Sequence, residues 1–590
     1  MMAADGDSGK VRSWLGRLSA RDLIERYVPI ASWLPAYPRR RLRADLVGAV
    51  TSWGVMVPVA MAYAQIAGVS AQVGLATAFA ALVGYAVFGT SRHLKVTTSS
   101  SMAIMSAAVV APLALGDATR YAALTAALAL VVGVVLVVAG FARLGFISNF
   151  LSKSVVTGFV FGLAITIMMG QIPKLFGLPA GSGNVFRQLF HLVSQLGDTN
   201  LYALAVGGGA LVLILLFRFF APRVPGALIA LVLGILVSSV FDLSAHGVSV
   251  VGEFTAGVPL PGLPDVRLFD IPYLLIGAAG IVFLAVGESL GTARAFGTKY
   301  HYEIEPDQEL VALGMANLAS GAFGGFTADA SLSQTATADA AGARSQLSSL
   351  VTAALVFLTL VLLGSLFSDL PNAVLGAVVI AAVLSLMDVR EMRRFYAQRR
   401  SDFLIALAAL LGVTLTDVLT GMIVAVVLSL VMVLARASRP NISVLGRVPG
   451  QRAGFGDVER HPENEQFPGL VIIRSDSPLY FFNVLAARAQ VLDLLAKTDP
   501  PARTVLIDIG ASADVDVTTS DALREFVAHL EMDGVELLLA QVRGPVRDRL
   551  RRTGLMDAIG DTHVFASVAD AVDHWLDRER AVAATPPLAP

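Results

Sequence analysis

The stretch Phe323-Gly-Gly-Phe-Thr-Ala-Asp-Ala-Ser-Leu-Ser-Gln-Thr-Ala-Thr-Ala-Asp339 interrupts a chain of long apolar runs. Its Gly, Ser and Thr content predicts a broken helix inside a membrane domain. In a bilayer, an unwound backbone is tolerated only where protein buries it or where it lines a wet cavity. A helix that begins between Asp329 and Ser333 would point free N–H groups and its positive dipole end into that cavity. Such an arrangement suits an anion near the membrane midplane.

A second interruption of the same kind lies in the first half of the chain, at Lys95-Val-Thr-Thr-Ser-Ser-Ser-Met102. Pro58 and Glu288 are also unusual residues for apolar runs. The sequence separation between them is nearly the same as that between Ser99 and Ser331. Paired interruptions at one offset predict the two inverted halves of a transporter. The alternative is that Ser and Gly merely let helices pack closely.

The composition is that of a polytopic membrane protein. Of 590 residues, 55% are hydrophobic and only 15% are charged, and the mean hydropathy is +0.69. A net charge of −1 argues against nucleic-acid binding, and the absence of cysteine excludes disulfides and thiolate chemistry. No nucleophile–base pair, phosphate-binding loop or metal-ligand spacing is visible, so we expect neither an enzyme nor a bound metal or other cofactor.

Hydropathy predicts about fourteen membrane segments within residues 45–436, the expected transmembrane transport domain. A full helical span needs about 20 residues, and some of these runs are shorter. The predicted segments are 45–67, 71–88, 98–116, 120–141, 153–173, 201–219, 224–241, 272–291, 308–325, 330–341, 347–367, 371–387, 402–417 and 419–436.

The distribution of basic residues predicts the orientation, because cytoplasmic loops are rich in Lys and Arg. With the N-terminus inside, most Lys and Arg residues near the segment ends lie on the cytoplasmic side. The outside receives only Arg120, Lys174, Arg187 and Arg267. We therefore expect a multi-pass protein with both termini in the cytoplasm.

The regions that flank the apolar domain are polar. Residues 1–44 are basic and predict a cytosolic arm, either an interfacial helix or a disordered segment, rather than a cleaved signal peptide. Residues 437–466 hold several Pro and Gly and predict a linker. Residues 467–578 predict a soluble α/β domain, and the Ala- and Pro-rich residues 579–590 predict a disordered tail.

The soluble domain is predicted from alternating strand and helix patterns. Buried strands are expected at 469–474, 504–508 and 534–540, and amphipathic helices at 518–533 and 544–554.

Short motifs run in a set order through both apolar halves and into this domain. They are Pro58 with Ala62-Tyr-Ala64, Gly89-Thr-Ser-Arg-His-Leu94, Glu288-Ser289, Ala293-Arg-Ala-Phe296, Glu309-Leu-Val-Ala-Leu-Gly-Met-Ala-Asn317, Phe323-Gly-Gly-Phe326, Ser331-Leu-Ser333 and Ala341-Gly-Ala-Arg-Ser-Gln346. Over about residues 40–578 the chain resembles the SulP family of anion transporters, the bacterial relatives of the SLC26 proteins. The C-terminal domain resembles a STAS domain through Leu506-Ile-Asp508 and Val515-Asp-Val-Thr518.

The resemblance implies a fold and a site. The fold is an α-helical membrane domain of fourteen segments in a 7+7 inverted repeat, with a core that slides against a gate in elevator-like alternating access, followed by a cytosolic α/β STAS domain. A homodimer in the plasma (inner) membrane of a bacterium is also implied. The anion site lies between the starts of the third and tenth segments, flanked by the first and eighth. The candidate substrate-binding residues are Tyr63, Thr98, Ser99, Ser331, Ser333 and Gln334.

Three positions depart from the usual family pattern. Val59 stands where Gln is usual, Thr97-Thr98 where Gly-Pro is usual, and Gln334 where many members carry Arg. The predicted site therefore offers an anion helix dipoles, hydroxyl groups and an amide, but no fixed positive side chain.

Glu288 is the candidate coupling residue. Ionised groups at the membrane midplane are costly and mark pathways or coupling ions. A carboxylate beside an anion repels it unless a proton or cation neutralises the carboxylate. We therefore expect H⁺ or Na⁺ to be co-transported through Glu288. The alternative is a structural Glu that caps a helix or pairs with Arg294, and Asp329 is expected to cap the tenth segment.

The predicted function is secondary active transport of a small anion: sulfate, bicarbonate or a dicarboxylate. One alternative is a nucleobase-type carrier of the same architecture, in which Glu288 would hydrogen-bond a neutral base. Another is a non-transporting membrane scaffold that presents its STAS domain. Because Val517 follows Asp516 where related STAS domains carry a phosphorylated Ser, we expect dimerisation or docking of a cytosolic protein partner rather than a phosphoswitch.

Overall fold

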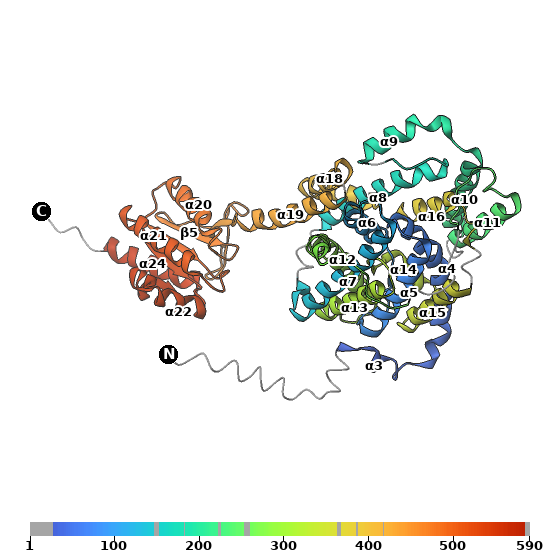
Figure 1. The fold of residues 1–590 in the computed structure, drawn as a ribbon. Coiled ribbons are helices and arrows are strands. Elements are labelled where there is room, and N and C mark those ends of the chain that lie inside the picture. Colours follow the sequence, from blue (N-terminus) through green and yellow to red (C-terminus); the bar gives the residue numbers. More distant parts are fainter. Residues whose placement is uncertain are drawn as a thin grey trace. The chain divides into compact units, whose positions relative to one another are not determined.

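The structure is a computed structural model that describes residues 27–146, 153–181, 183–221, 226–252, 260–362, 367–384, 387–416 and 418–584. The chain divides into two compact units, one helical and one α/β, and the division lies between Ser429 and Leu430. Figure 1 shows both as ribbons, with the helical unit coloured blue to yellow and the α/β unit orange to red.

The helical unit is built from two halves, which follow a short helix α3 (Ile30–Trp33) and a turn at Arg39–Arg41. The first half contains α4 (Leu42–Ile66), α5 (Ala71–Phe88), α6 (Ser100–Ala114), α7 (Ala118–Phe141), α8 (Lys153–Leu175), α9 (Val185–Ser194), α10 (Leu201–Phe220) and α11 (Gly226–Phe241). The second half contains α12 (Ile271–Tyr300), α13 (Pro306–Ala322), α14 (Leu332–Ala340), α15 (Leu347–Leu362), α16 (Asn372–Val383), α17 (Val389–Gln398), α18 (Arg400–Leu415) and α19 (Val418–Ala437).

Each predicted apolar segment corresponds to one of these helices, and the polytopic helical fold is confirmed. Helices α9 and α17 were not predicted, because polar residues break up their apolar positions and neither forms an apolar run. By length and composition, six helices in the described part of the chain could cross a membrane: α4, α5, α7, α8, α10 and α12. Helices α6, α11, α15 and α16 are shorter and apolar.

The helices pack as two sets, and each set takes members from both halves. Helices α4, α5, α6 and α7 pack with α12, α13, α14 and α15, and form the core. Helices α8, α10 and α11 pack with α16 and α18, and form the gate. This exchange between the halves is the 7+7 arrangement that the resemblance implied.

Glycine lets the two halves approach closely inside the core. Helices α7 and α13 cross at Gly133 and Gly314, where an added Cβ on Gly314 would lie 2.7 Å from the Gly133 carbonyl oxygen. A side chain at either position would force the helices apart, so small residues are required for this contact.

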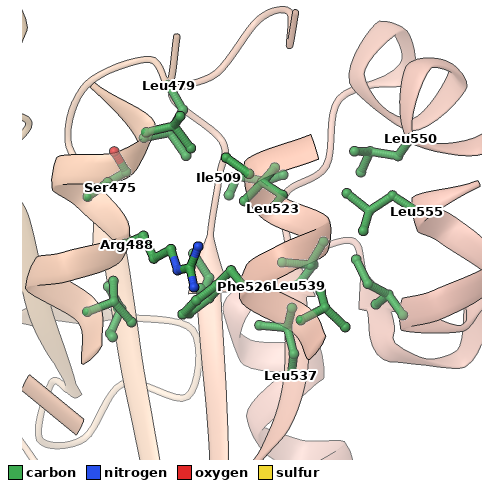
Figure 2. Close-up of a pocket in the computed structure, with 18 of the residues that line it drawn as sticks. Ser475, Leu479, Arg488, Ile509, Leu523, Phe526, Leu537, Leu539, Leu550 and Leu555 are labelled. Atoms are coloured by element: carbon green, nitrogen blue, oxygen red, sulfur yellow. The ribbon is translucent and has the colours of Figure 1, made fainter. Parts of the chain in front are cut away.

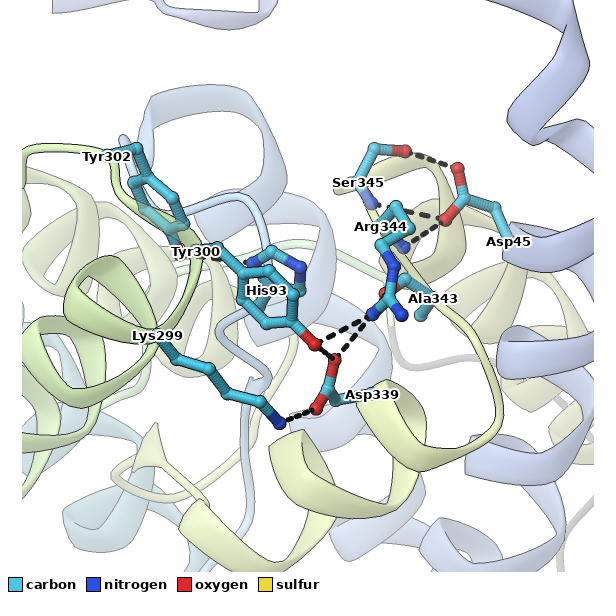
Figure 3. Close-up of polar contacts among 9 residues, drawn as sticks. All are labelled: Asp45, His93, Lys299, Tyr300, Tyr302, Asp339, Ala343, Arg344 and Ser345. Atoms are coloured by element: carbon cyan, nitrogen blue, oxygen red, sulfur yellow. Dashed lines mark hydrogen bonds and ion pairs between the residues drawn. The ribbon is translucent and has the colours of Figure 1, made fainter.

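A polar cluster fastens the end of α14 to the start of α4 (Figure 3). The Asp339 carboxylate accepts hydrogen bonds from Tyr300, Lys299 and Arg344 at 2.5, 2.6 and 2.6 Å. The Asp45 carboxylate accepts from the Arg344 N–H at 2.6 Å and from the Ser345 hydroxyl at 2.7 Å. Both buried acids are therefore fully supplied with donors.

The α/β unit is built on a six-stranded sheet of order β4-β3-β5-β6-β7-β8. Strands β5, β6, β7 and β8 are parallel, whereas β3 is antiparallel to β4 and β5. The strands are β3 (Ile442–Arg447), β4 (Phe455–Asp457), β5 (Leu470–Ser475), β6 (Thr504–Asp508), β7 (Glu536–Ala540) and β8 (Val564–Phe565). The three predicted strands are thus β5, β6 and β7.

Helices cover both faces of this sheet. One face packs against α20 (Val484–Ala496), α21 (Val517–Met532), α22 (Gly544–Arg552) and α23 (Leu555–Ile559), and the other against α24 (Val568–Ala584). Between the sheet and helices α20 to α23 lies an apolar cavity of about 50 Å³ (Figure 2). Leucine, isoleucine and phenylalanine side chains line most of it. The predicted helices at 518–533 and 544–554 correspond to α21 and α22.

The polar flanks differ from the sequence-based expectation in two places. Strands β3 and β4 lie within residues 437–466, so the stretch predicted as a linker contributes to the sheet. Helix α24 continues to Ala584, so residues 579–584 are helical rather than part of a disordered tail. Of the N-terminal arm, residues 1–26 lie outside the described residues.

Candidate functional site

The two predicted interruptions meet inside the core. They form two short strands, β1 (Val96–Thr97) and β2 (Asp329–Ala330), which pair antiparallel. Val96 lies opposite Ala330 and Thr97 opposite Asp329, and the Ser331 N–H donates to the Lys95 carbonyl at 3.0 Å. Helix α6 begins directly after β1, and α14 begins directly after β2. The starts of the third and tenth segments are therefore side by side.

The two helix starts are capped in the same way. Ser99 caps α6 by accepting from the Met102 N–H at 3.3 Å, and Ser331 caps α14 by accepting from the Gln334 N–H at 3.4 Å. In each half the capping hydroxyl also contacts the hydroxyl two residues later, with Oγ–Oγ distances of 3.1 Å to Ser101 and 3.2 Å to Ser333. A Ser-x-Ser unit therefore marks both halves of the repeat.

Side chains of neighbouring helices hold the unwound backbone before α14. Asn317 donates to the Ala328 carbonyl and accepts from the Ala328 N–H, both at 2.9 Å. The Ser320 hydroxyl donates to the Phe326 carbonyl at 2.6 Å. Asn317, in the Glu309–Asn317 run of α13, therefore supports this unwound backbone, because buried backbone groups need partners when no helix supplies them.

Glu288 reaches the site from α12. It accepts a hydrogen bond from the Ser101 hydroxyl at 3.1 Å, next to the cap of α6. The adjacent Ser289 hydroxyl accepts from the Ala330 N–H at 3.0 Å, which fixes α12 against β2. Tyr63 of α4 is buried and lies beside Ser100 and near Glu288. Side chains of the first, third, eighth and tenth segments thus lie close together, in the arrangement that the family resemblance implied.

Several buried polar atoms near these side chains have no hydrogen-bond partner among the described residues. They are the hydroxyls of Thr97 and Thr98, both carboxylate oxygens of Asp329 and both amide atoms of Gln334. Buried polar groups in native proteins are almost always paired with protein, water or ligand. These atoms lie on or next to β1 and β2 and in the first turn of α14.

The six predicted substrate-binding residues do not lie in equal environments. Tyr63, Thr98, Ser99 and Gln334 are buried, Ser331 is partly exposed, and Ser333 is exposed. Glu288 is also partly exposed. The accessible side chains of this set are therefore those of Ser331, Ser333 and Glu288.

The expected role of Asp329 is wrong. Ser331 caps α14, and Asp329 lies two residues earlier in β2, fully buried. Ser101, Ser289 and Thr97 also lie at the candidate site, although they were not among the six candidate substrate-binding residues. The duplicated Ser-x-Ser unit was the signal that could have identified Ser101, since it stands where Ser333 stands in the other half.

The described residues contain no group of three or more His, Cys, Asp and Glu side chains that could hold a metal. Lys95 contributes its backbone to the site, but its ammonium group donates to the hydroxyls of Ser348 and Ser349 at 2.5 and 3.0 Å. Its charge is thus directed to the start of α15.

Comparison with known proteins agrees with this geometry. The sulfate permease family model matches residues 42–409, and the STAS domain model matches residues 461–571. A probable sulfate transporter of Mycobacterium tuberculosis is 36% identical over 554 residues, covering 93% of this chain and 99% of the relative. Sulfate transporter 1.1 of Arabidopsis thaliana is 28% identical over 576 residues, covering 93% and 88%.

Solved structures show the same fold. The murine anion transporter Slc26a9 in its inward-facing state superposes with a TM-score of 0.86 at 24% identity, covering 95% of this chain and 96% of that one. The transmembrane domain of the cyanobacterial bicarbonate transporter BicA gives a TM-score of 0.58 at 24% identity, covering 67% and 98%. The chain therefore belongs to the sulfate permease family, the SulP/SLC26 anion transporters, which are multi-pass membrane transporters and not enzymes, and it carries a C-terminal STAS domain.

Proposed function

We propose that this protein is a secondary active transporter whose anion binds between the N-termini of α6 and α14. The pairing of β1 with β2 supports this site, because it brings two helix starts, each capped by a Ser-x-Ser unit, to one point. Free N–H groups and helix dipoles at such a point favour negative charge. The unpartnered groups of Thr98 and Gln334 add hydrogen-bonding capacity for the solute.

Sulfate is the first substrate to test. The curated relatives are named as sulfate transporters, and a structural neighbour is titled a bicarbonate transporter. Bicarbonate and dicarboxylates are therefore the next candidates. A site of hydroxyls, an amide and N–H groups can bind each of these oxyanions by hydrogen bonds to oxygen.

Glu288 is proposed to couple transport to H⁺ or Na⁺. Its carboxylate lies beside Ser101 at the start of α6, where an ionised form would repel an anion. A proton or cation bound at Glu288 removes that repulsion, so anion and cation move together. The core then moves against the gate in an elevator-like way.

We propose a homodimer in a bacterial inner membrane with both termini cytoplasmic, and a STAS domain that docks a cytosolic partner.

The test is uptake of radiolabelled sulfate, bicarbonate, succinate and uracil into proteoliposomes, with and without inward H⁺ or Na⁺ gradients. We expect an oxyanion to accumulate under one of the two gradients, and Glu288→Gln to abolish gradient-driven accumulation. Asp117→Asn is the matched control, because Asp117 caps α7 at an exposed position and Asn is an equally good cap. Uptake of uracil alone, or of no solute, would contradict the proposal in favour of a nucleobase carrier or a scaffold.

A further inference from the structure

Asp329 differs from the other buried carboxylates that the structure describes. Asp45 and Asp339 have the donors shown in Figure 3. Glu309 accepts from the Tyr85 hydroxyl at 2.6 Å and the Thr90 N–H at 2.8 Å. Asp270 pairs with Arg120 at 3.0 Å. In contrast, neither oxygen of Asp329 receives a hydrogen bond of ordinary geometry from a described group, although the Ser99 hydroxyl lies close and the Asp329 side chain is fully buried.

The group beside Asp329 is another carboxyl. Asp329 and Glu288 lie within hydrogen-bonding reach of each other. The backbone explains the contact, because the Ala330 N–H donates to Ser289 and so places the residue after Asp329 against the residue after Glu288. Glu288 has one described donor, the Ser101 hydroxyl. A single hydroxyl cannot compensate two adjacent negative charges, of which the one on Asp329 is fully buried.

Among the described residues, no Lys or Arg side chain acts on either carboxyl of the pair. The other titratable group close to both carboxyls is the Tyr63 phenol on α4. A phenol ordinarily keeps its proton up to about pH 10 and adds no positive charge. The Lys95 ammonium is bonded to Ser348 and Ser349. From α6, the groups near the pair are the uncharged hydroxyls of Ser99 and Ser101.

Two carboxyl groups in contact cannot both ionise in such a place, and sharing one proton between them resolves the repulsion. We propose that Glu288 and Asp329 form one proton-binding site, in which the two carboxyls hold a shared proton, and that the co-transported ion is therefore H⁺ rather than Na⁺. This inference rests on the proposed transport function and adds Asp329 as a second proton-carrying residue.

The shared site also explains why this chain can bind an anion without a fixed positive side chain. With one proton the pair carries a single negative charge, and with a second proton it is neutral. The second proton would enter with the anion between the starts of α6 and α14 and leave with it on the other side. Proton uptake at the pair and anion binding at Ser99 and Ser331 thus favour each other, as linkage requires.

The test uses the full-length protein in proteoliposomes, with labelled sulfate as the probe and a pH-sensitive dye inside the vesicles. The proposal predicts that sulfate entry carries protons, and that Asp329→Asn moves the pH midpoint of uptake to higher pH by about one unit or more, because a shared proton no longer holds the pair in its singly protonated form and no longer opposes uptake of the transported proton. Asp329→Glu should keep the wild-type profile, and so should the control Asp117→Asn. An unchanged midpoint in Asp329→Asn, or uptake driven by Na⁺ without proton movement, would overturn the proposal.

A second measurement does not depend on variants or on the choice of substrate. Infrared spectroscopy of the wild-type protein at neutral pH should show the C=O band of a protonated, buried carboxyl, and deprotonation at high pH should remove it. Absence of the band at neutral pH would overturn the shared proton. If the band is present but no labelled anion enters the vesicles, the proton site stands and the proposed transport function fails, so the two outcomes are distinguishable.

Discussion

Thr97 of β1 lies directly opposite Asp329 of β2. Because β1 belongs to the first half of the helical unit and β2 to the second, this strand pairing joins the two halves at the candidate site. This pairing fixes the relative position of two helix starts that are far apart in sequence. The pairing also places Asp329, a buried carboxylate that has no hydrogen-bond partner among the described residues, beside the starts of α6 and α14. The positions of both the proposed anion site and the proposed proton site follow from this short piece of sheet.

The helix caps can be tested by removing one hydroxyl at a time. Ser99→Ala and Ser331→Ala should each reduce the free energy of unfolding by about 1 kcal/mol, because an N-cap is lost. They should also raise the KM for the transported anion, since the caps orient the N–H groups that bind it. Thermal unfolding and concentration-dependent uptake measure the two effects. Asn184→Ala, at the exposed cap of α9, should reduce stability without changing KM.

Gln334 can be replaced by the residue that many family members carry. Gln334→Arg adds a positive charge at a buried position whose amide has no described partner. We expect tighter binding of divalent sulfate and weaker dependence of uptake on a proton gradient, because the arginine compensates the carboxyl pair. Gln334→Met, which keeps the size and removes the polar atoms, should lower uptake instead. Equal effects of both variants would rule out a polar role for this side chain.

Asn317 can be tested as the support of the unwound backbone. In Asn317→Ala the N–H and C=O of Ala328 both lose their partner, at a cost of about 1–3 kcal/mol for each group. We expect a lower melting temperature and a loss of uptake, although Asn317 does not contact the helix starts. Wild-type stability in this variant would show that the loop does not depend on Asn317.

The STAS domain should respond to acid through Asp516. Burial tends to raise its pKa, but hydrogen bonds from the Thr519 and Phe481 N–H groups outweigh burial and hold the pKa below its ordinary value. The resulting stabilisation is therefore present above about pH 4, the ordinary pKa of Asp, and is lost as the pH falls through the lower folded-state value. In the full-length protein, hydrogen exchange of α21, corrected for intrinsic rates, should rise below about pH 4. Asp516→Asn, which caps without titrating, should remove this rise.

Hydropathy was sufficient to predict the membrane helices, because each apolar run has the length of a helix or part of one. The two interruptions could also be predicted, since Gly, Ser and Thr have a clear meaning in an apolar setting. Their contact could be inferred only from the repeat and the family resemblance. The place of Asp329 in β2 was missed, because it depends on strand pairing, and a cap at Asp329 is as compatible with the sequence as the observed cap two residues later at Ser331.

The soluble domain shows the same limit. Strands β5, β6 and β7 are apolar and buried on both faces, so they are visible in the sequence. Strand β3 alternates buried and partly exposed residues beside several Pro and Gly, and β4 has three residues. Neither carries a strong strand pattern, and both are stabilised by neighbours that lie elsewhere in the chain. Pairing of this kind cannot be read from one sequence.

The most direct measurement of the central claim is the location of a bound oxyanion. Selenate has the shape and charge of sulfate, and anomalous diffraction locates its selenium atom in crystals of the full-length protein. We predict a selenium peak between the starts of α6 and α14, within reach of Ser99 and Ser331. A peak at another place, or none under conditions in which vesicles take up the ion, would contradict the account.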